Sequence, residues 1–218
     1  GPSGGGKSTL TRVVNCLVPS FYEGELTGTV RLFGREVDDI PSWERGLAAG
    51  NVFQDPRSQF FANEVAGEIA FGCENYGLDH ELIVERVHGA ASELDIAPLL
   101  EEKVRLLSYG MRQRVAIARA LSLEPDAIIA DEPTSALDVS VRAQILNLLM
   151  DLKRDLGLSM VFISHDIQTV RYISDQIIVM NHGQAVERGT AEQIFNNPKD
   201  DYTRLLLGAA PSLLHPEL

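Results

Sequence analysis

The sequence has no long hydrophobic run and is poor in cysteine, in aromatic residues and in positive charge. Because no apolar stretch approaches the ~20 residues that cross a bilayer, we expect any membrane-spanning segment to belong to other chains. The two cysteines, Cys16 and Cys73, form no C-x-x-C pair, which favours reduced thiols in a cytosolic protein. The chain has 19 Lys and Arg against 31 Asp and Glu, and its net charge of −12 argues against non-specific nucleic-acid binding.

The remaining composition is that of an ordinary folded protein. Of the 218 residues, 44% are hydrophobic and 23% are charged, which argues against a disordered chain. This length is enough for one large hydrophobic core or two modest lobes.

The chain opens on a phosphate-binding pattern, G-x-x-x-x-G-K-[ST]. In such a loop, glycines let consecutive backbone N–H groups point at phosphate oxygens, and the following helix adds its positive dipole end. Lys7 can reach the β- and γ-phosphates of ATP, and the Ser8 hydroxyl can ligate Mg²⁺. The alternative is a glycine-rich linker that matches the pattern by chance. The residues expected to bind the nucleotide are Gly1, Ser3, Gly4, Gly5, Gly6, Lys7, Ser8 and Thr9.

A P-loop joins a buried strand to a helix, here expected from residue 7 to about 17. The sequence begins at the loop itself, so we expect the N-terminal strands that precede a P-loop to be missing from it.

Further along, four apolar residues at 127–130 lead directly into Asp131 and Glu132. An apolar run of this kind is typical of a strand buried on both faces. Such a strand would deliver Asp131 to the phosphate site, where its carboxylate can hold Mg²⁺ together with Ser8. Glu132 would then lie beside an attacking water, which its carboxylate can orient or deprotonate. The alternative is a strand that simply ends in solvated acids.

The hydrophobic periodicity predicts an α/β fold with a mainly parallel core sheet, an antiparallel β hairpin and an α-helical subdomain. We divide the chain into a P-loop core with hairpin at 1–61, the helical subdomain at 62–121, the second part of the core at 122–208 and a C-terminal tail at 209–218. Strands are expected within 26–34 (a half-exposed hairpin), 47–53, 127–130, 160–163 (buried), 177–180 and 185–187, the last two closing the sheet. The clearest helical stretches are 81–87, 112–120, 141–156 and 167–173.

Residues 107–121 read Leu-Ser-Tyr-Gly-Met-Arg-Gln-Arg-Val-Ala-Ile-Ala-Arg-Ala-Leu. With the P-loop and the acidic pair, they resemble the ATP-binding cassette (ABC) ATPases, a family of P-loop NTPases, over residues 1 to about 207. The segment is similar to the family's signature sequence, Leu-Ser-Gly-Gly-Gln, with Tyr109 in place of the first glycine and Met111 in place of the glutamine. Physically it is a second helix N-terminus suited to an anion. The resemblance implies that Ser108 and Gly110 contact the γ-phosphate held by a second ABC subunit in a head-to-tail dimer.

Three shorter segments fit the same family. Gln54 resembles the glutamine of the Q-loop, a Mg²⁺ and water contact that links the helical subdomain to the core. Residues 135–138 resemble the D-loop, which crosses the dimer interface, and His165 resembles the switch histidine, which contacts the γ-phosphate. The resemblance therefore implies three catalytic residues, Glu132, His165 and Gln54, and three Mg²⁺ ligands, Ser8, Gln54 and Asp131.

Two importer branches of the family are represented. Residues 51–61 and 68–72 look like the energy-coupling-factor ATPases that drive vitamin and cobalt or nickel uptake. Residues 131–141 and 197–204 look like oligopeptide and dipeptide importer ATPases. We lean slightly towards the energy-coupling-factor type, because in this family the Q-loop region meets the membrane subunit.

The resemblance implies an ATP-binding subunit of an ABC importer, which binds and hydrolyses MgATP in a homodimer or heterodimer. It would drive uptake of a vitamin, cobalt, nickel or a peptide through separate transmembrane permease subunits, from the cytoplasmic face of the cell membrane. Two alternatives stay open: a nucleotide-binding regulatory module with little turnover, and a soluble ABC ATPase outside transport. The second usually carries long coiled-coil insertions or tandem cassettes, and the sequence shows neither.

Overall fold

The computed structural model describes residues 6–15, 17–18 and 20–209. Contacts separate the chain into unit 1, residues 1–11 and 163–218, and unit 2, residues 12–162. Five residues named above, Gly1, Ser3, Gly4, Gly5 and Cys16, lie outside the described part.

Helix α1, Lys7–Val14, follows the P-loop and is shorter than the predicted 7–17. It ends before Asn15, whose side-chain NH₂ group donates a hydrogen bond to the side-chain oxygen of Asn51 over 2.8 Å. Asparagine disfavours helix interiors because its side chain offers competing hydrogen bonds, and here that bond is to a strand.

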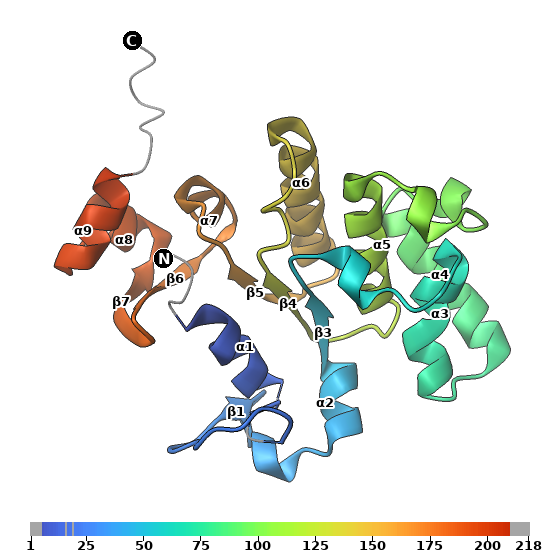
Figure 1. Ribbon diagram of the computed structural model, residues 1–218, viewed down its shortest axis with the longest axis horizontal. Helices are drawn as coiled ribbons and strands as arrows, with labels where there is room; N and C mark the ends of the chain where they lie inside the picture. The colour runs from blue at the N-terminus through green and yellow to red at the C-terminus, as the bar shows by residue number, and fades with distance from the viewer. Residues whose placement is uncertain (1–5, 16, 19, 210–218) are drawn as a thin grey trace. The chain divides into compact units, whose positions relative to one another are not determined.

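The centre of unit 2 is a three-stranded sheet in the order β3-β4-β5 (Figure 1). The strands are β3 (Ala49–Val52), β4 (Ala127–Asp131) and β5 (Ser159–Ile163). Strands β3 and β4 pair in parallel, with Val52 opposite Ala130. All four residues at 127–130 are buried, which confirms the predicted continuous apolar strand. Strand β3 begins two residues after the predicted 47 because residues 47 and 48 complete helix α2 (Ser42–Ala48).

The expectation that residues 160–163 are buried is wrong. Ser159 and Val161 are exposed and the two residues that alternate with them, Met160 and Phe162, are half-buried, so only the final residue, Ile163, is fully buried. The strand lies at one end of the three-strand order, whereas β4 has a neighbouring strand on each side.

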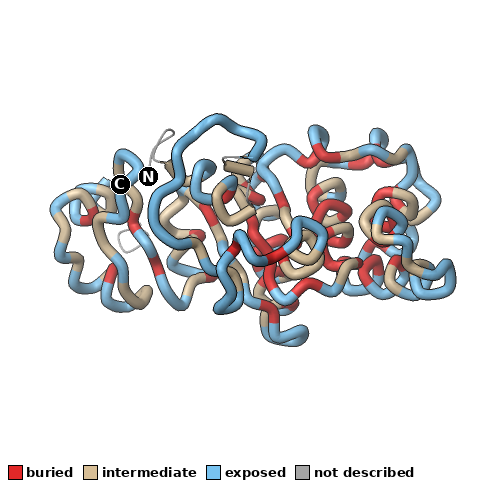
Figure 2. Tube along the Cα trace, turned by 90° about the horizontal axis from the view of Figure 1, so that it is seen from below, coloured by how far each residue is buried: buried red, intermediate tan, exposed pale blue. Residues whose placement is uncertain are grey.

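Helices fill the segment between β3 and β4, as predicted for 62–121. They are α3 (Val65–Asn75), α4 (His80–Glu93) and α5 (Tyr109–Leu121), with short 3₁₀ turns η2 (Pro56–Gln59), η3 (Ala97–Leu99) and η4 (Val104–Leu106). Helices α3 and α5 pack against each other, and each carries a fully buried isoleucine, Ile69 on α3 and Ile117 on α5. Figure 2 colours the buried stretches of the chain red. Cys73 is a buried free thiol in this core, and its Sγ donates to the Ser122 carbonyl over 3.3 Å.

The predicted hairpin at 26–34 forms only at its far end. Strands β1 (Arg31–Leu32) and β2 (Arg35–Glu36) pair antiparallel around Phe33 and Gly34, both at positive φ. The 3₁₀ turn η1 (Val37–Asp39) then turns the chain away, so residues 26–29 have no strand opposite them and stay exposed. The hairpin is thus shorter and more exposed than expected.

Helix α6 (Val139–Asp155) connects β4 to β5 within unit 2 and matches the predicted helix at 141–156. The Asp138 carboxylate caps its first turn by accepting the Val141 N–H over 2.9 Å. It also accepts the Ser140 hydroxyl, and these two bonds lower the pKa of Asp138.

Unit 1 contains a helix at the predicted position 167–173, a strand pair and two C-terminal helices. The elements are α7 (Ile167–Ile173), β6 (Gln176–Asn181), β7 (Gln184–Thr190), α8 (Ala191–Asn196) and α9 (Asp201–Gly208). Ile177, Val179 and Ile194 form its core. Strands β6 and β7 pair antiparallel around His182 and Gly183, as expected, but within the described chain they form a sheet of their own rather than closing the β3-β4-β5 sheet. The two-residue turn lets the backbone N–H and C=O groups of each strand form hydrogen bonds with those of the other.

Candidate nucleotide site

In unit 1, the described part of the P-loop leads straight into the first turn of α1. Gly6 has φ +82°, and a Cβ on it would lie 2.9 Å from the Cα of Gly183, so both backbone conformation and space require glycine. Lys7 and Ser8 are the first two helical residues, and the Ser8 carbonyl accepts the Thr11 hydroxyl over 2.8 Å. The first backbone N–H groups of a helix have no intrahelical partners, so this arrangement suits a phosphate.

His165 also belongs to unit 1 and lies between β5 and α7. Its side chain is exposed, and Asp166 directly after it caps α7 by accepting the Gln168 N–H over 3.0 Å. The Ser164 hydroxyl accepts the Asp166 N–H over 3.0 Å and tightens the same turn. The imidazole is therefore presented on a short connection whose backbone is fixed on both sides.

In unit 2, the other predicted ligands leave neighbouring strands at one edge of the sheet. Asp131 ends β4 and Glu132 follows it, while Gln54 comes two residues after the end of β3. Because Val52 and Ala130 are paired in parallel register, the segments that follow β3 and β4 both leave the sheet at its carboxyl edge. In open α/β sheets this edge is where ligands bind.

Glu132 has a backbone conformation that favours glycine, with φ +50°. Its carbonyl accepts both the backbone N–H and the hydroxyl of Ser135, over 3.2 and 3.1 Å, which holds the turn in place. A strained non-glycine residue of this kind costs about 1–3 kcal/mol and is found most often at functional sites. This backbone strain is a second observation, separate from the sequence pattern, that favours a functional role for Glu132.

The signature segment starts a helix, as predicted. Ser108 is the N-cap of α5, and its Oγ accepts the Met111 N–H over 3.3 Å. Gly110 lies in the first turn, where a Cβ would be only 2.6 Å from Cγ1 of Val141 on α6. Close packing against α6 is thus one reason for this glycine, besides any contact with phosphate.

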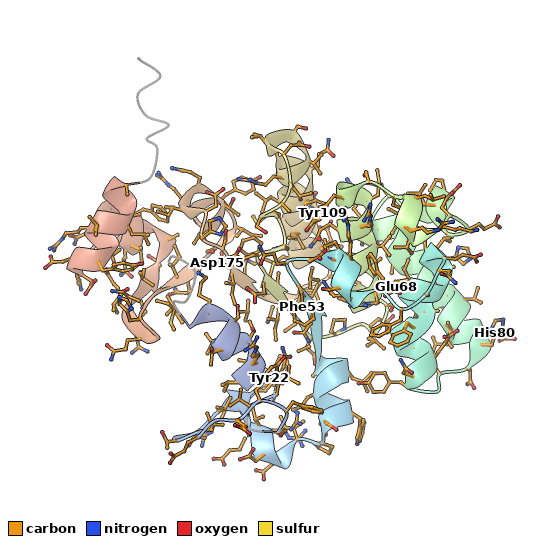
Figure 3. All side chains as sticks on the ribbon, viewed as in Figure 1. Tyr22, Phe53, Glu68, His80, Tyr109 and Asp175 are labelled. Atoms are coloured by element: carbon orange, nitrogen blue, oxygen red, sulfur yellow. The ribbon has the colours of Figure 1, made fainter. Side chains whose placement is uncertain are left out.

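Sequence reasoning missed what Tyr109 does. Its hydroxyl donates to the Gln54 carbonyl over 2.6 Å, so the first residue of α5 is bonded to the Q-loop segment, residues 54–59. Figure 3 labels Tyr109. Burial and the nearby Asp55 carboxylate raise the pKa of Tyr109, which keeps the phenol protonated and able to donate. Nothing in the sequence pattern links positions 54 and 109.

Sequence reasoning also missed a buried charge network beside the Q-loop segment. Glu68 on α3 is fully buried, and its carboxylate accepts the N–H groups of Phe61 and Ala62, each over 2.8 Å. Arg119 on α5 donates to Glu68 over 2.7 Å and to the Gln59 carbonyl over 2.5 Å. A signal was present, because Glu68 lies among apolar residues on the buried face of its helix, where a charge needs a partner.

The donors expected for Mg²⁺ are the Ser8 hydroxyl, the Gln54 amide and the Asp131 carboxylate. All three offer oxygen, which this hard cation prefers, so their chemistry fits the ion. Among the residues that the structure describes, no group of three His, Cys, Asp or Glu side chains is placed to hold a metal. In the same residues no helix is both long and apolar enough to pass through a bilayer.

Comparison with known proteins shows the family to which the chain belongs. A sequence model of the family described as ABC transporter matches residues 1–135. The chain belongs to the ABC transporter ATP-binding family. This ABC chain is 42% identical to the dipeptide transport ATP-binding protein DppF of Haemophilus influenzae, over 98% of its own length and 65% of that protein's. It is 39% identical to the oligopeptide transport ATP-binding protein OppF of Escherichia coli K12, over 97% of its length and 64% of that protein's.

A solved structure confirms the ABC ATPase fold. The cbiO1 protein of Clostridium perfringens, described as part of the ABC transporter complex cbiONQ, matches with a TM-score of 0.82 and 31% identity. The match covers 90% of this chain and 77% of that one. The ABC chain spans slightly less than two thirds of the length of DppF and OppF, at 65% and 64%. The predicted α/β fold and family are therefore confirmed, whereas the individual site residues remain predictions.

Proposed function

We propose that the chain is the ATP-binding subunit of an ABC importer and that it binds and hydrolyses MgATP in a head-to-tail dimer. The observation that carries the proposal is the common sheet edge of β3 and β4, where Gln54, Asp131 and Glu132 leave paired parallel strands. Family membership and the names of DppF and OppF support it.

The predicted site residues divide the work of hydrolysis between them in this proposal. Lys7 and the P-loop amides neutralise the phosphates, as phosphoryl transfer requires. Glu132 orients or deprotonates the attacking water, and His165 helps to position it. Ser8, Gln54 and Asp131 would hold Mg²⁺, which would supply positive charge to neutralise the phosphates, and Gln54 would also contact the attacking water.

A second subunit completes the site, because Ser108 and Gly110 would meet the γ-phosphate bound by the partner. Such an arrangement is two-fold symmetric for identical chains and pseudo-symmetric for a pair of different ones. Transmembrane permease subunits would be further partners, with the chain at the cytoplasmic face of the membrane.

For the cargo we propose a peptide. The support is that DppF and OppF are named for dipeptide and oligopeptide transport and are 39–42% identical to this chain. The lean towards energy-coupling-factor importers has weaker support, in the 31% identity to cbiO1. Reconstitution with its permease subunits tests this: ATP-dependent uptake of a labelled dipeptide supports the peptide branch, and vitamin or cobalt uptake without peptide uptake contradicts it.

The decisive experiment compares nucleotide binding with turnover in Glu132→Gln. We expect the variant to bind MgATP as tightly as the unmodified chain but to turn over about 100-fold more slowly, the effect of losing a general base. The matched control is Glu85→Gln on the exposed surface of α4, which should change neither quantity. If the unmodified chain binds MgATP and Glu132→Gln alters nothing, the chain is a regulatory binding module and the proposal fails.

A further inference from the structure

The start of helix α5 is bonded to the Q-loop segment by one side chain. Tyr109, the first residue of α5, is half-buried, and its hydroxyl donates to the Gln54 carbonyl over 2.6 Å. The acceptor is the main chain of Gln54, so the Gln54 side chain is left available for other contacts. Residue 108, directly before the tyrosine, caps the same helix.

The other end of the same segment is held by the far end of the same helix. Arg119 donates to the Gln59 carbonyl over 2.5 Å and to the Gln59 side-chain oxygen over 3.0 Å. Gln59 in turn donates to the Asp55 carbonyl over 3.1 Å. Positions 109 and 119 are ten residues apart, about 15 Å along a helix. Residues 54–59 are therefore bonded to one rigid element at both ends.

The two anchors differ in strength and in exposure. Arg119 is largely buried and is paired with the fully buried Glu68. Tyr109 makes one neutral hydrogen bond at a half-exposed position, and the residue at this place in the Leu-Ser-Gly-Gly-Gln form of the signature has no side chain to donate. The tyrosine anchor is therefore the weaker one, and it is the one nearest to Gln54.

We propose that Tyr109 is a positioning residue that ties the Gln54 main chain to the start of the signature helix. Through this bond the Q-loop and Ser108 move as one body, so that Gln54 is in place for hydrolysis when Ser108 meets the partner's nucleotide. The proposal rests on the proposed function, since the role of Gln54 in hydrolysis comes from there.

The test uses Tyr109→Phe, which removes only the hydroxyl, with Tyr76→Phe as the matched control. Tyr76 makes the same kind of bond elsewhere in unit 2, from its hydroxyl to the Trp43 carbonyl over 3.0 Å. Hydrogen exchange of the amides at 53–62 is followed without nucleotide in the full chain. We expect exchange there to be about fivefold faster in Tyr109→Phe, the effect of losing one neutral hydrogen bond, and unchanged in Tyr76→Phe.

The catalytic consequence is read from MgATP hydrolysis by the same variants. In Tyr109→Phe we expect kcat to fall about fivefold while the Kd for MgATP stays constant, because the bond positions Gln54 and does not bind nucleotide. Tyr109→Gly should show the same two effects.

Exchange at 53–62 that is equal in Tyr109→Phe and Tyr76→Phe would overturn the proposal, and so would an unchanged kcat. Failure of the proposed function can be told apart from failure of this proposal. If the unmodified chain hydrolyses no ATP, hydrogen exchange at 53–62 still shows whether the bond from Tyr109 to Gln54 restrains the segment. Faster exchange in such a chain would confirm the bond and leave only the catalytic consequence overturned.

Discussion

Gly110 has two separable reasons to be a glycine. A Cβ would meet Val141 Cγ1 at 2.6 Å, which is a packing reason, and the resemblance to the signature adds a phosphate contact through its backbone. We expect Gly110→Ala to lower the free energy of unfolding by about 1–3 kcal/mol, the cost of overpacking. Urea unfolding measures this change.

The control is the double variant Gly110→Ala/Val141→Ala. Its free energy of unfolding is compared with that of Val141→Ala alone. Removing the valine methyl groups should recover most of the stability lost on adding the alanine. Equal losses with and without Val141 would show that the methyl contact is not the cause. Hydrolysis that stays low in the stable double variant would favour the phosphate contact.

At the scale of single residues, the sequence predicts candidate site residues from local patterns but does not predict contacts between residues that are far apart in the chain. The P-loop pattern and the acidic pair at the end of β4 can be singled out from the sequence because each is a pattern of adjacent positions, and their roles stay predictions. Tyr109 and Gln54 are 55 positions apart, and Glu68 and Arg119 are 51 apart. No periodicity relates such positions, so these bonds depend on how the helices pack and could not be predicted.

At the scale of elements, the predictions held where a segment is determined by its own sequence. Helix α7 has the predicted bounds, and β4 is buried throughout, because apolar spacing and an aspartate cap are local signals. The hairpin and β5 differ from the prediction for one reason. The length and burial of a strand depend on the segments that pack against it. That information is absent from the segment itself.

The buried pair of Glu68 and Arg119 holds together α3, α5 and the Q-loop segment. We expect Glu68→Gln to lower the free energy of unfolding by about 3 kcal/mol, because it leaves the guanidinium without its charged partner. Urea unfolding is again the measurement. The matched control is Glu124→Gln, which breaks the Arg86 pair at a largely exposed glutamate and should cost less than about 1 kcal/mol. Equal costs for the two substitutions would contradict a structural role for the buried pair.

At the scale of the whole molecule, the proposed activity depends on two ABC subunits, identical or different, forming a dimer. The signature residues of one chain would act on the nucleotide of the other, so a single chain would lack part of each proposed site. Family membership follows from the sequence and is confirmed by the matching family model and by the relatives DppF and OppF, whereas pairing itself is a proposal.

The measurement that tests this account most directly is Mg²⁺-dependent ATP hydrolysis as a function of protein concentration, with Glu132→Gln beside the unmodified chain. The account predicts that the rate rises faster than linearly with concentration as dimers form, and that it collapses in Glu132→Gln. A rate per chain that does not depend on concentration, or one that Glu132→Gln leaves unchanged, would contradict it.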